Sequence, residues 1–224
     1  APVLYRNPPS LNQYEVSEKK EKFYAMMVPA ILIAKYHTDQ KRAKFESIKD
    51  RLLQDQTLHP YDSIYLKELL TEYKCKKLQE LDLKLITHPV SIVLAQAAVE
   101  SGWGSSRFFL EANNIFGIWS LNKNEPRIRA VFSRSGYPIY LKKYENLAES
   151  IEDYFRTIAR VKAYQKFREK RGETDDPFEM VPYLNRYSEQ GQVYTRKIAN
   201  LIRNNDLTRF DQFQVDPEAL VKLE

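Results

Sequence analysis

The hydrophobic residues of this chain recur mostly every three or four positions, which predicts a mainly helical protein. From about residue 15 to residue 54 they form one stripe that includes Phe23, Ile31 and Ile48. Pro29 lies inside that stretch and is expected to kink or restart the helix. A loop at 59–60 and a second helix, about 63–78, follow. The two helical segments are expected to form a hairpin that packs on the rest of the chain.

The most apolar helical stretch begins at Pro89 and carries one carboxylate, Glu100, almost at its C-terminal end. The residues three, four and seven positions earlier share its helical face, and they are Ala97, Gln96 and Val93. A carboxylate on this largely apolar face would be partly desolvated, which raises its pKa and favours the protonated form that a general acid needs. The alternative is a solvent-facing glutamate, with the glycines that follow it acting only as helix caps.

Helical periodicity stops after residue 119 and alternation replaces it. Two alternating segments, with Ile128 in the first and Leu141 in the second, flank a turn at 134–136. This pattern predicts a small β-hairpin. Beyond it, a capping box at 146–149 predicts the start of another helix. A last strong helix is expected over about 190–204, and the residues after Leu207 are expected to form a tail.

Composition excludes several classes of function. The chain has 224 residues, of which 43% are hydrophobic and 29% charged, as in ordinary globular proteins. No apolar run approaches the roughly 20 residues of a membrane span. Cys75 is the single cysteine, so an internal disulfide is excluded, and neither a metal nor a cofactor is expected. The net charge of +5 suits a polyanionic partner or simply solubility, but the basic residues are too dispersed to favour nucleic acid.

Two motifs resemble the bacterial N-acetylglucosaminidases of glycoside hydrolase family 73. The first is AQAAVESGWGSSRF, residues 95–108, followed by NNIFGIW, residues 113–119. The second is NRYSEQGQVY, residues 185–194, which resembles the paired-tyrosine segment of the Bax-like branch of that family. The resemblance covers about residues 80–207 well and residues 15–80 loosely.

The resemblance implies a fold and a domain organisation. The expected fold is mainly α (α+β), a lysozyme-like helical domain over 81–207 with a small β-hairpin lobe. An extended arm (1–14) and the helical hairpin (15–80) would precede it, and a tail (208–224) would follow. The chain starts at Ala1 without a signal peptide, so a mature or trimmed form is expected. A periplasmic, cell-envelope or secreted location and a monomeric state are also expected.

The implied substrate is the glycan strand of peptidoglycan, cleaved at the β-1,4 bond after N-acetylglucosamine. Glu100 would protonate the glycosidic oxygen, and Trp103 offers a flat face of the kind that stacks on sugar rings. Tyr187 would face the sugar-binding cleft from the second motif. The remaining substrate-binding residues would be Asn113, Asn114, Phe116, Gly117, Trp119 and Tyr194.

The second catalytic group is not evident from the sequence. Glycosidases usually need two carboxylates, and many members of the family supply the second from the β-lobe. Here the segment RIRAVFSRSGYPIYL, residues 127–141, contains no acid. Glu125 lies just before it, and Glu111 is expected to face outward from a short helix. Either Glu125 holds a water, or the 2-acetamido group of the substrate attacks the anomeric carbon with help from Tyr187.

Two other functions compete with this prediction. A lytic transglycosylase also uses a single glutamate, but such enzymes carry a Gly-Leu-Met-Gln type segment where this chain has Asn-Ile-Phe-Gly-Ile at 114–118. A non-catalytic module that binds cell-wall glycan would explain the missing β-lobe acid. A binding site gains nothing from a desolvated acid, however, so Glu100 favours an enzyme.

Overall fold

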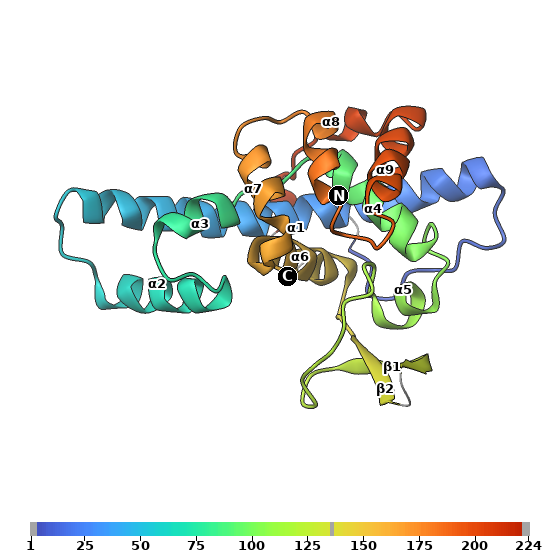
Figure 1. The fold of residues 1–224 in the computed structure, drawn as a ribbon, viewed down its shortest axis with the longest axis horizontal. Coiled ribbons are helices and arrows are strands. Elements are labelled where there is room, and N and C mark those ends of the chain that lie inside the picture. The colour runs from blue at the N-terminus through green and yellow to red at the C-terminus, as the bar shows by residue number, and fades with distance from the viewer. Residues whose placement is uncertain (1–3, 135–136, 221–224) are drawn as a thin grey trace.

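One long helix runs the length of the molecule (Figure 1). The computed structural model describes residues 4–134 and 137–220. In it α1 spans Val16–Leu53 and continues through Pro29, so the expected restart of the helix at that residue is wrong. Pro29 has no backbone N–H, so the carbonyl of Ala25 has no helical donor; Ala25 is exposed, and water can replace that donor.

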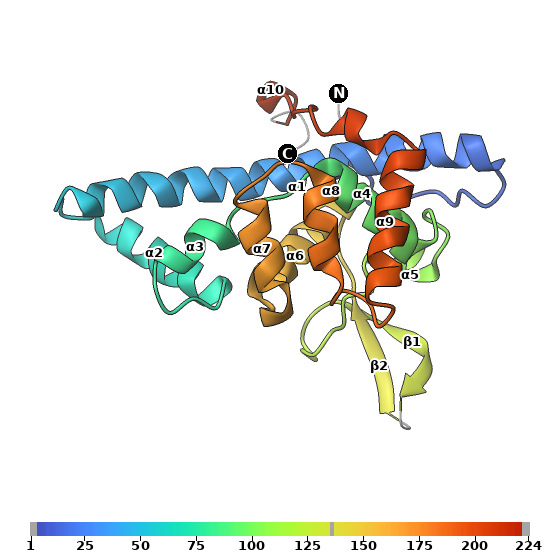
Figure 2. The same cartoon turned by 45° about the horizontal axis from the view of Figure 1, so that its top comes forward.

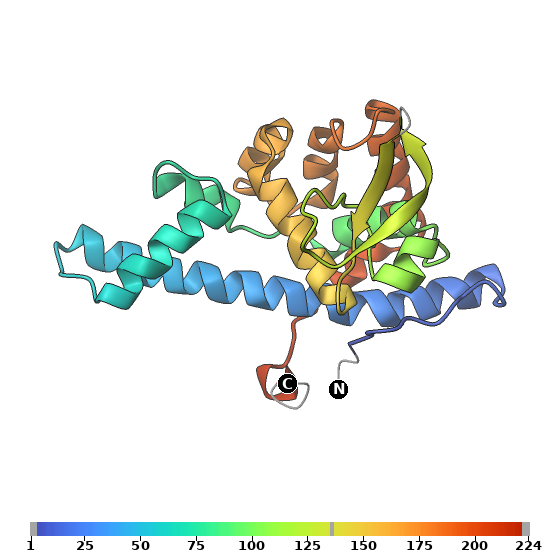
Figure 3. The same cartoon turned by 90° about the horizontal axis from the view of Figure 1, so that it is seen from below.

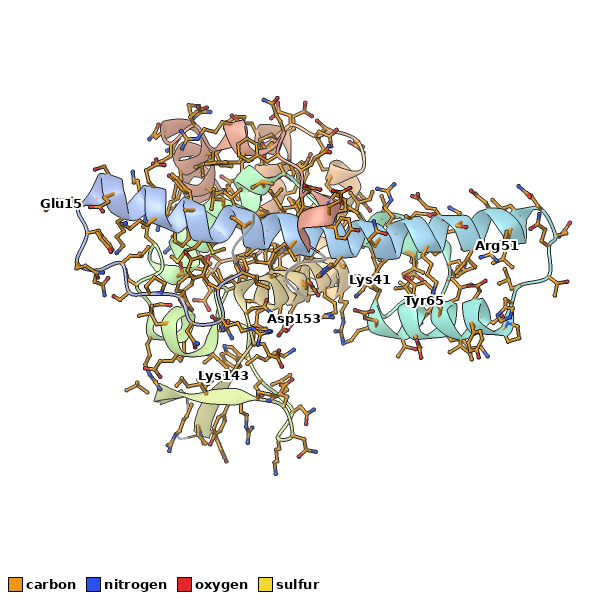
Figure 4. The ribbon with its side chains drawn as sticks, turned by 180° about the vertical axis from the view of Figure 1, so that it is seen from behind. Glu15, Lys41, Arg51, Tyr65, Lys143 and Asp153 are labelled. Carbon is orange, nitrogen blue, oxygen red and sulfur yellow. The ribbon has the colours of Figure 1, made fainter. Side chains whose placement is uncertain are left out.

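The second half of α1 and α2, Pro60–Glu72, form a helical hairpin (Figure 4). The prediction for this second helix was wrong at both ends. His59 caps α2 early by accepting from the backbone N–H of Tyr61, and Lys74 ends the helical path with a φ of +50°. Tyr65 on α2 donates to the carbonyl of Lys41 on α1 at 3.3 Å. A separate small core joins the hairpin to α3, Gln79–Lys84, and to Ala159; it comprises Phe45, Ile48, Leu66, Leu69, Tyr73, Leu81 and Leu85.

The main helical domain lies on one side of the first half of α1 (Figures 2 and 3). Its central helix is α4, Val90–Ser101, which is buried along almost its whole length and packs against α1 and α9. The other elements of this domain are α5 (Arg107–Ala112), α6 (Leu147–Arg160), α7 (Gln165–Arg171), α8 (Pro177–Met180) and α9 (Gln192–Asn204), with 3₁₀ turns at Lys162–Tyr164 (η1), Val181–Leu184 (η2) and Leu207–Phe210 (η3).

A two-stranded antiparallel sheet projects from the helical domain (Figure 1). Strands β1, Arg127–Arg134, and β2, Tyr137–Lys142, pair Ile128 with Leu141, and the register is irregular between Arg129 and Ser133. The predicted β-hairpin is therefore confirmed. Of the turn predicted over 134–136, Ser135 and Gly136 lie outside the described residues.

Ion pairs attach the sheet to α6. Lys142 of β2 lies 2.8 Å from the carboxylate of Asp153, which also accepts from the hydroxyl of Tyr144 and pairs with Arg156. Burial would raise the pKa of Asp153, but its hydrogen bond to Lys142 and the charges of Arg156 and Lys142 outweigh burial and hold that pKa below its usual range. Asp153 lies on the side of α6 that faces the sheet (Figure 4).

The residues after α9 contribute to the helical domain. Leu207 is fully buried, and η3 packs on α4. Asp211 accepts from both the backbone N–H and the hydroxyl of Ser91, at 2.7 and 2.8 Å, and so caps the first turn of α4. The segment expected to be a tail therefore holds the start of the central helix. A short α10, Pro217–Leu220, follows beyond this contact.

The predicted capping box is also present. The side chain of Asn146 accepts from the backbone N–H of Glu149 at 3.0 Å, and α6 begins at Leu147. The fold class expected from the sequence, mainly helical with a small β-hairpin lobe, is confirmed. Among the described residues, no helix combines the length and the apolar character that crossing a membrane requires.

Candidate active site

Glu100 lies in the last turn of α4, where the helix ends abruptly. Gly102 follows with a φ of +58°, in the left-handed region that favours glycine, and terminates the helix as its C-cap. The hydroxyl of Ser101 fixes the next turn by donating to the carbonyl of Ala97 and accepting from the backbone N–H of Gly104. The sequence ESGWG thus places a carboxylate at the exposed end of an otherwise buried helix.

Four tyrosines lie near the carboxylate of Glu100. They are Tyr154 of α6, Tyr164 of η1, Tyr187 in the segment before α9, and Tyr194 of α9 itself. The negative charge of Glu100 contributes to a raised pKa at each of them. The rings of Tyr187 and Tyr194 stack with centroids 5.5 Å apart. We call these four residues the tyrosine cluster.

The pKa of Glu100 is raised above its usual value because the carboxyl is partly desolvated, although one side of the residue is open to solvent. Two interactions oppose that shift. The hydroxyl of Tyr194 donates to Oε1 of Glu100 at 2.9 Å, and Lys197 adds a positive charge from the same helix. The net direction is the one a general acid needs, because a larger fraction stays protonated toward neutral pH.

Gln96 connects two members of the tyrosine cluster from inside α4. Its amide donates to the hydroxyl of Tyr194 at 2.9 Å and accepts from the hydroxyl of Tyr154 at 2.6 Å. Tyr154 is buried at helical spacing in α6, so the local sequence marks it only as a core residue. The signal that was available is Gln96 itself, a polar side chain buried in an apolar helix one turn before Glu100.

Tyr187 is available for a ligand. Its ring is fixed by Tyr194, Tyr164 and Tyr154, but its hydroxyl makes no hydrogen bond to any residue that the structure describes. Burial raises the pKa of Tyr187 well above its usual value, so this hydroxyl keeps its proton and can act as a donor. Tyr194 differs, because both Glu100 and Gln96 already occupy its hydroxyl.

Glu125 lies in the loop before β1. Its Oε1 accepts from the backbone N–H of Asn122 at 3.4 Å, and its Oε2 lies 3.9 Å from the ammonium of Lys142. The structure thus associates Glu125 with the base of the β-hairpin, and no direct contact joins it to Glu100 or to the tyrosine cluster. Glu111 faces outward as expected, paired with Arg107 at 3.0 Å on the surface of α5.

Both asparagines of the NNIFGIW motif are used to build structure. Asn113 adopts a φ of +51° at the end of α5, and its amide donates to the carbonyls of Arg6 and Tyr144. Asn114 is fully buried; its amide nitrogen donates to the carbonyls of Ile118 and Lys142, and its oxygen accepts from the N–H of Ile118. The structure thus occupies both amide nitrogens and the oxygen of Asn114, while the oxygen of Asn113 has no hydrogen-bond partner but is buried.

The other residues of this motif lie between the tyrosine cluster and the sheet. Phe116 stacks on Tyr154 with centroids 4.3 Å apart. Gly117 has a φ of +65° and open space where a side chain would stand. Trp119 is 49% exposed, and its backbone pairs with Leu141 at the end of β2. Among the residues predicted to bind substrate, Trp119 offers the most accessible aromatic surface.

Trp103 lies on a different side of the domain. Its ring packs edge-on against Phe23 and Tyr24 of α1, with centroids 5.5 and 5.9 Å away, and Lys20 covers it at 5.3 Å. The structure therefore does not bring this ring to the tyrosine cluster. Within the described residues, no three His, Cys, Asp or Glu side chains gather in a way that could hold a metal ion.

Comparisons with known proteins agree on one family. Residues 75–207 match the glucosaminidase family, described as mannosyl-glycoprotein endo-beta-N-acetylglucosaminidase. Protein bax of Escherichia coli is 27% identical over 123 residues, which is 52% of this chain and 43% of that protein, so the chain spans less than half of this relative.

Two solved structures are also similar to this chain. The catalytic domain of the autolysin Auto from Listeria monocytogenes has 24% identity and a TM-score of 0.47, covering 74% of this chain and 97% of that one. The glycoside hydrolase domain of FlgJ from Salmonella typhimurium has 20% identity and a TM-score of 0.42, covering 60% of this chain and 80% of that one.

Proposed function

Because this chain belongs to the glucosaminidase family, glycoside hydrolase family 73, we infer that it hydrolyses the glycan strands of peptidoglycan. The bond cleaved is the β-1,4 linkage after N-acetylglucosamine. The observation that carries this proposal is the carboxyl of Glu100, which has a raised pKa and lies among aromatic rings at the open end of a buried helix. Such a group keeps its proton to a higher pH than an ordinary glutamate and can release it to a leaving oxygen.

Glu100 acts as the general acid in this mechanism. The hydrogen bond from Tyr194 reaches only Oε1, so Oε2 is the oxygen that can carry the proton toward the glycosidic oxygen. Once the proton has left, the hydrogen bond from Tyr194 and the charge of Lys197 stabilise the carboxylate that remains. The protein groups that raise and lower the pKa of Glu100 therefore serve the two halves of the acid's cycle.

The second half of the reaction is assigned to the substrate. In this route the 2-acetamido oxygen attacks the anomeric carbon while the glycosidic bond breaks and Glu100 gives its proton to the leaving oxygen. Water, whose proton returns to the Glu100 carboxylate, then opens the cyclic intermediate. The unpaired hydroxyl of Tyr187 donates a hydrogen bond to the acetamido group. The competing route places a water on Glu125. We favour the first route, since the described contacts hold Glu125 at the base of the β-hairpin and leave the hydroxyl of Tyr187 beside Glu100 without a partner.

Replacing one oxygen or one hydroxyl separates the two routes. Glu125→Gln keeps the size of the side chain and is expected to leave the rate of hydrolysis within about twofold of wild type, because the substrate supplies the nucleophile. Tyr187→Phe keeps the ring stack and is expected to lower kcat by about tenfold to a hundredfold. The opposite pattern would assign the second role to Glu125.

The products distinguish this function from the two alternatives. Purified peptidoglycan is incubated with the protein, and the released fragments are measured by mass spectrometry with and without borohydride reduction. The glucosaminidase is expected to leave reducing N-acetylglucosamine ends. Anhydro-muramic ends would identify a lytic transglycosylase, and binding without any fragment would identify a glycan-binding module. With this substrate, the proposed place of action is the cell envelope.

A further inference from the structure

Arg171 is a buried cation with no acidic partner among the described residues. It lies on α7 and is 4% exposed. Its Nη2 donates to the carbonyls of Leu83 and Lys84 at 2.9 and 3.4 Å, which caps α3, and its Nη1 points to Nδ1 of His88 at 3.4 Å. A buried charge without an opposite charge is costly. Capping a helix of six residues does not explain why a full cation is kept here.

His88 accepts a hydrogen bond from Arg171 on one side and donates one on the other. A guanidinium can only donate hydrogen bonds, so Nδ1 of His88 must accept, and the imidazole proton is left on Nε2. That nitrogen lies 2.8 Å from the hydroxyl of Tyr154 and donates to it. Burial and the charges of Arg171 and Lys35 lower the pKa of His88 well below its usual value, which agrees with a neutral ring carrying one proton.

The same direction holds at every later contact. Tyr154 has received a hydrogen bond from His88, so its own proton goes to Oε1 of Gln96, at 2.6 Å. The amide nitrogen of Gln96 then donates to Tyr194, at 2.9 Å, and Tyr194 donates to Glu100, at 2.9 Å. Five hydrogen bonds therefore run one way, each donor facing the next acceptor, from a guanidinium to a carboxyl.

We propose that Arg171, His88, Tyr154 and Gln96 are positioning residues that act through Tyr194 to fix the orientation and the protonation of Glu100. The proposal rests on the proposed function, in which Glu100 is the general acid. In a low-dielectric interior, hydrogen bonds that share one direction polarise and strengthen each other. This series of hydrogen bonds transfers no proton from Arg171 to Glu100, because the amide of Gln96 keeps its two hydrogens. It keeps the hydroxyl proton of Tyr194 aimed at Glu100.

The surroundings of Glu100 allow this effect to be isolated. Tyr194 and Lys197 face it from α9, Tyr187 from the segment before α9, Tyr164 from η1 and Tyr154 from α6. Tyrosines are uncharged at neutral pH, and the raised pKa values of these four keep them protonated to still higher pH. Among the groups around Glu100, Lys197 is therefore the charged one, and it also lowers the pKa of Glu100. Lys197 is kept in all the variants below.

The test measures the titration of Glu100 in the resting protein. The protein is labelled with ¹³C at the glutamate carboxyls. The resonance of Glu100 is assigned from its loss in Glu100→Gln, and the pKa of Glu100 is measured by following that resonance across a pH series. Tyr154→Phe and His88→Leu interrupt the hydrogen-bond chain but leave Tyr194 in place. Each is expected to raise the pKa of Glu100 by about half a pH unit, since Tyr194 becomes a weaker donor.

Conservative and control variants separate positioning from simple damage. His88→Gln can accept from Arg171 through its oxygen and donate to Tyr154 through its nitrogen, so it is expected to keep the wild-type pKa. Arg168 is a second buried arginine on α7. It donates to the carbonyls of Ile158 and Val161, which take no part in the five hydrogen bonds described above. Arg171→Met is expected to raise the pKa of Glu100, and Arg168→Met is expected to leave it unchanged.

Hydrolysis gives a second readout. The alkaline limb of the kcat/KM profile should move up by the same fraction of a pH unit in Tyr154→Phe and His88→Leu. Folded variants that keep both the pKa and the limb of wild type would overturn the inference, as would His88→Gln behaving like His88→Leu. The NMR titration needs no substrate, so a wild-type protein that fails to hydrolyse peptidoglycan would overturn the proposed function alone.

Discussion

Replacing Tyr194 by phenylalanine removes the only hydrogen bond that a described residue donates to Glu100. A hydrogen bond to a charged group contributes about 1.5–3 kcal/mol. Glu100 is open to solvent on one side, and water can replace part of that contribution, so we take about 1.4 kcal/mol. This corresponds to about one pKa unit. Because the lost bond favoured the ionised carboxylate, the pKa of Glu100 should rise further.

The direction of the effect on activity follows from the role of Glu100. A general acid works in its protonated form, so a higher pKa extends activity to higher pH. In Tyr194→Phe the alkaline limb of kcat/KM should therefore move up by about one pH unit. Hydrolysis of purified peptidoglycan across a pH series measures the limb, and the carboxyl NMR titration measures the pKa in the same protein.

Tyr187→Phe is the matched control for this experiment. It also removes a hydroxyl from the tyrosine cluster and keeps the stacked ring, but that hydroxyl makes no hydrogen bond to Glu100. Its kcat is expected to fall while the alkaline limb stays where it is in wild type. An unmoved or lowered limb in Tyr194→Phe would refute the assignment of Tyr194 as the donor that tunes the acid.

Three further predictions concern stability. Asn114→Ala removes three buried hydrogen bonds and should lower the free energy of unfolding in urea by about 3 kcal/mol, even without substrate. Phe45→Ala opens the small core of the helical hairpin and should cost about 3–5 kcal/mol, with hydrolysis retained in the folded fraction at low temperature. A carboxyl whose pKa is raised in the folded state makes the protein less stable as the pH rises through that pKa. Above that pH, Glu100→Gln should therefore be more stable than wild type by less than about 1 kcal/mol. The difference should vanish below pH ~4, where the carboxyl is protonated in both states.

Local patterns in the sequence were enough to predict the main elements. The three-to-four residue spacing gave α1, α4 and α9, and alternation gave the β-hairpin. The end of α2 was missed because Lys74 adopts a left-handed backbone conformation, which a lysine does not predict. The structural role of the segment after Leu207 was missed because it arises from one distant contact, between Asp211 and Ser91.

The site was predicted only in part, for the same physical reason. Helical spacing put Glu100 on an apolar face, and the resemblance of the surrounding motif to a known family made it the candidate acid. Trp103 could not be placed, since the direction of its ring depends on how α1 packs beside α4. The amides of Asn113 and Asn114 looked free for a sugar, but distant residues occupy their nitrogens and the oxygen of Asn114, and the unpaired oxygen of Asn113 is buried. The partners of Gln96 lie 58 and 98 residues away, so no local motif could reveal them.

The central claim is that Glu100 supplies the proton for glycan cleavage. Glu100→Gln keeps the shape of the side chain and a hydrogen-bond acceptor for Tyr194, but cannot donate an acidic proton. The decisive measurement is the rate at which wild type and Glu100→Gln release reducing N-acetylglucosamine ends from purified peptidoglycan, with binding to the same material measured by co-sedimentation. We predict a rate at least about a thousandfold lower with binding retained. A variant that still cleaves at a tenth of the wild-type rate or faster would contradict the assignment.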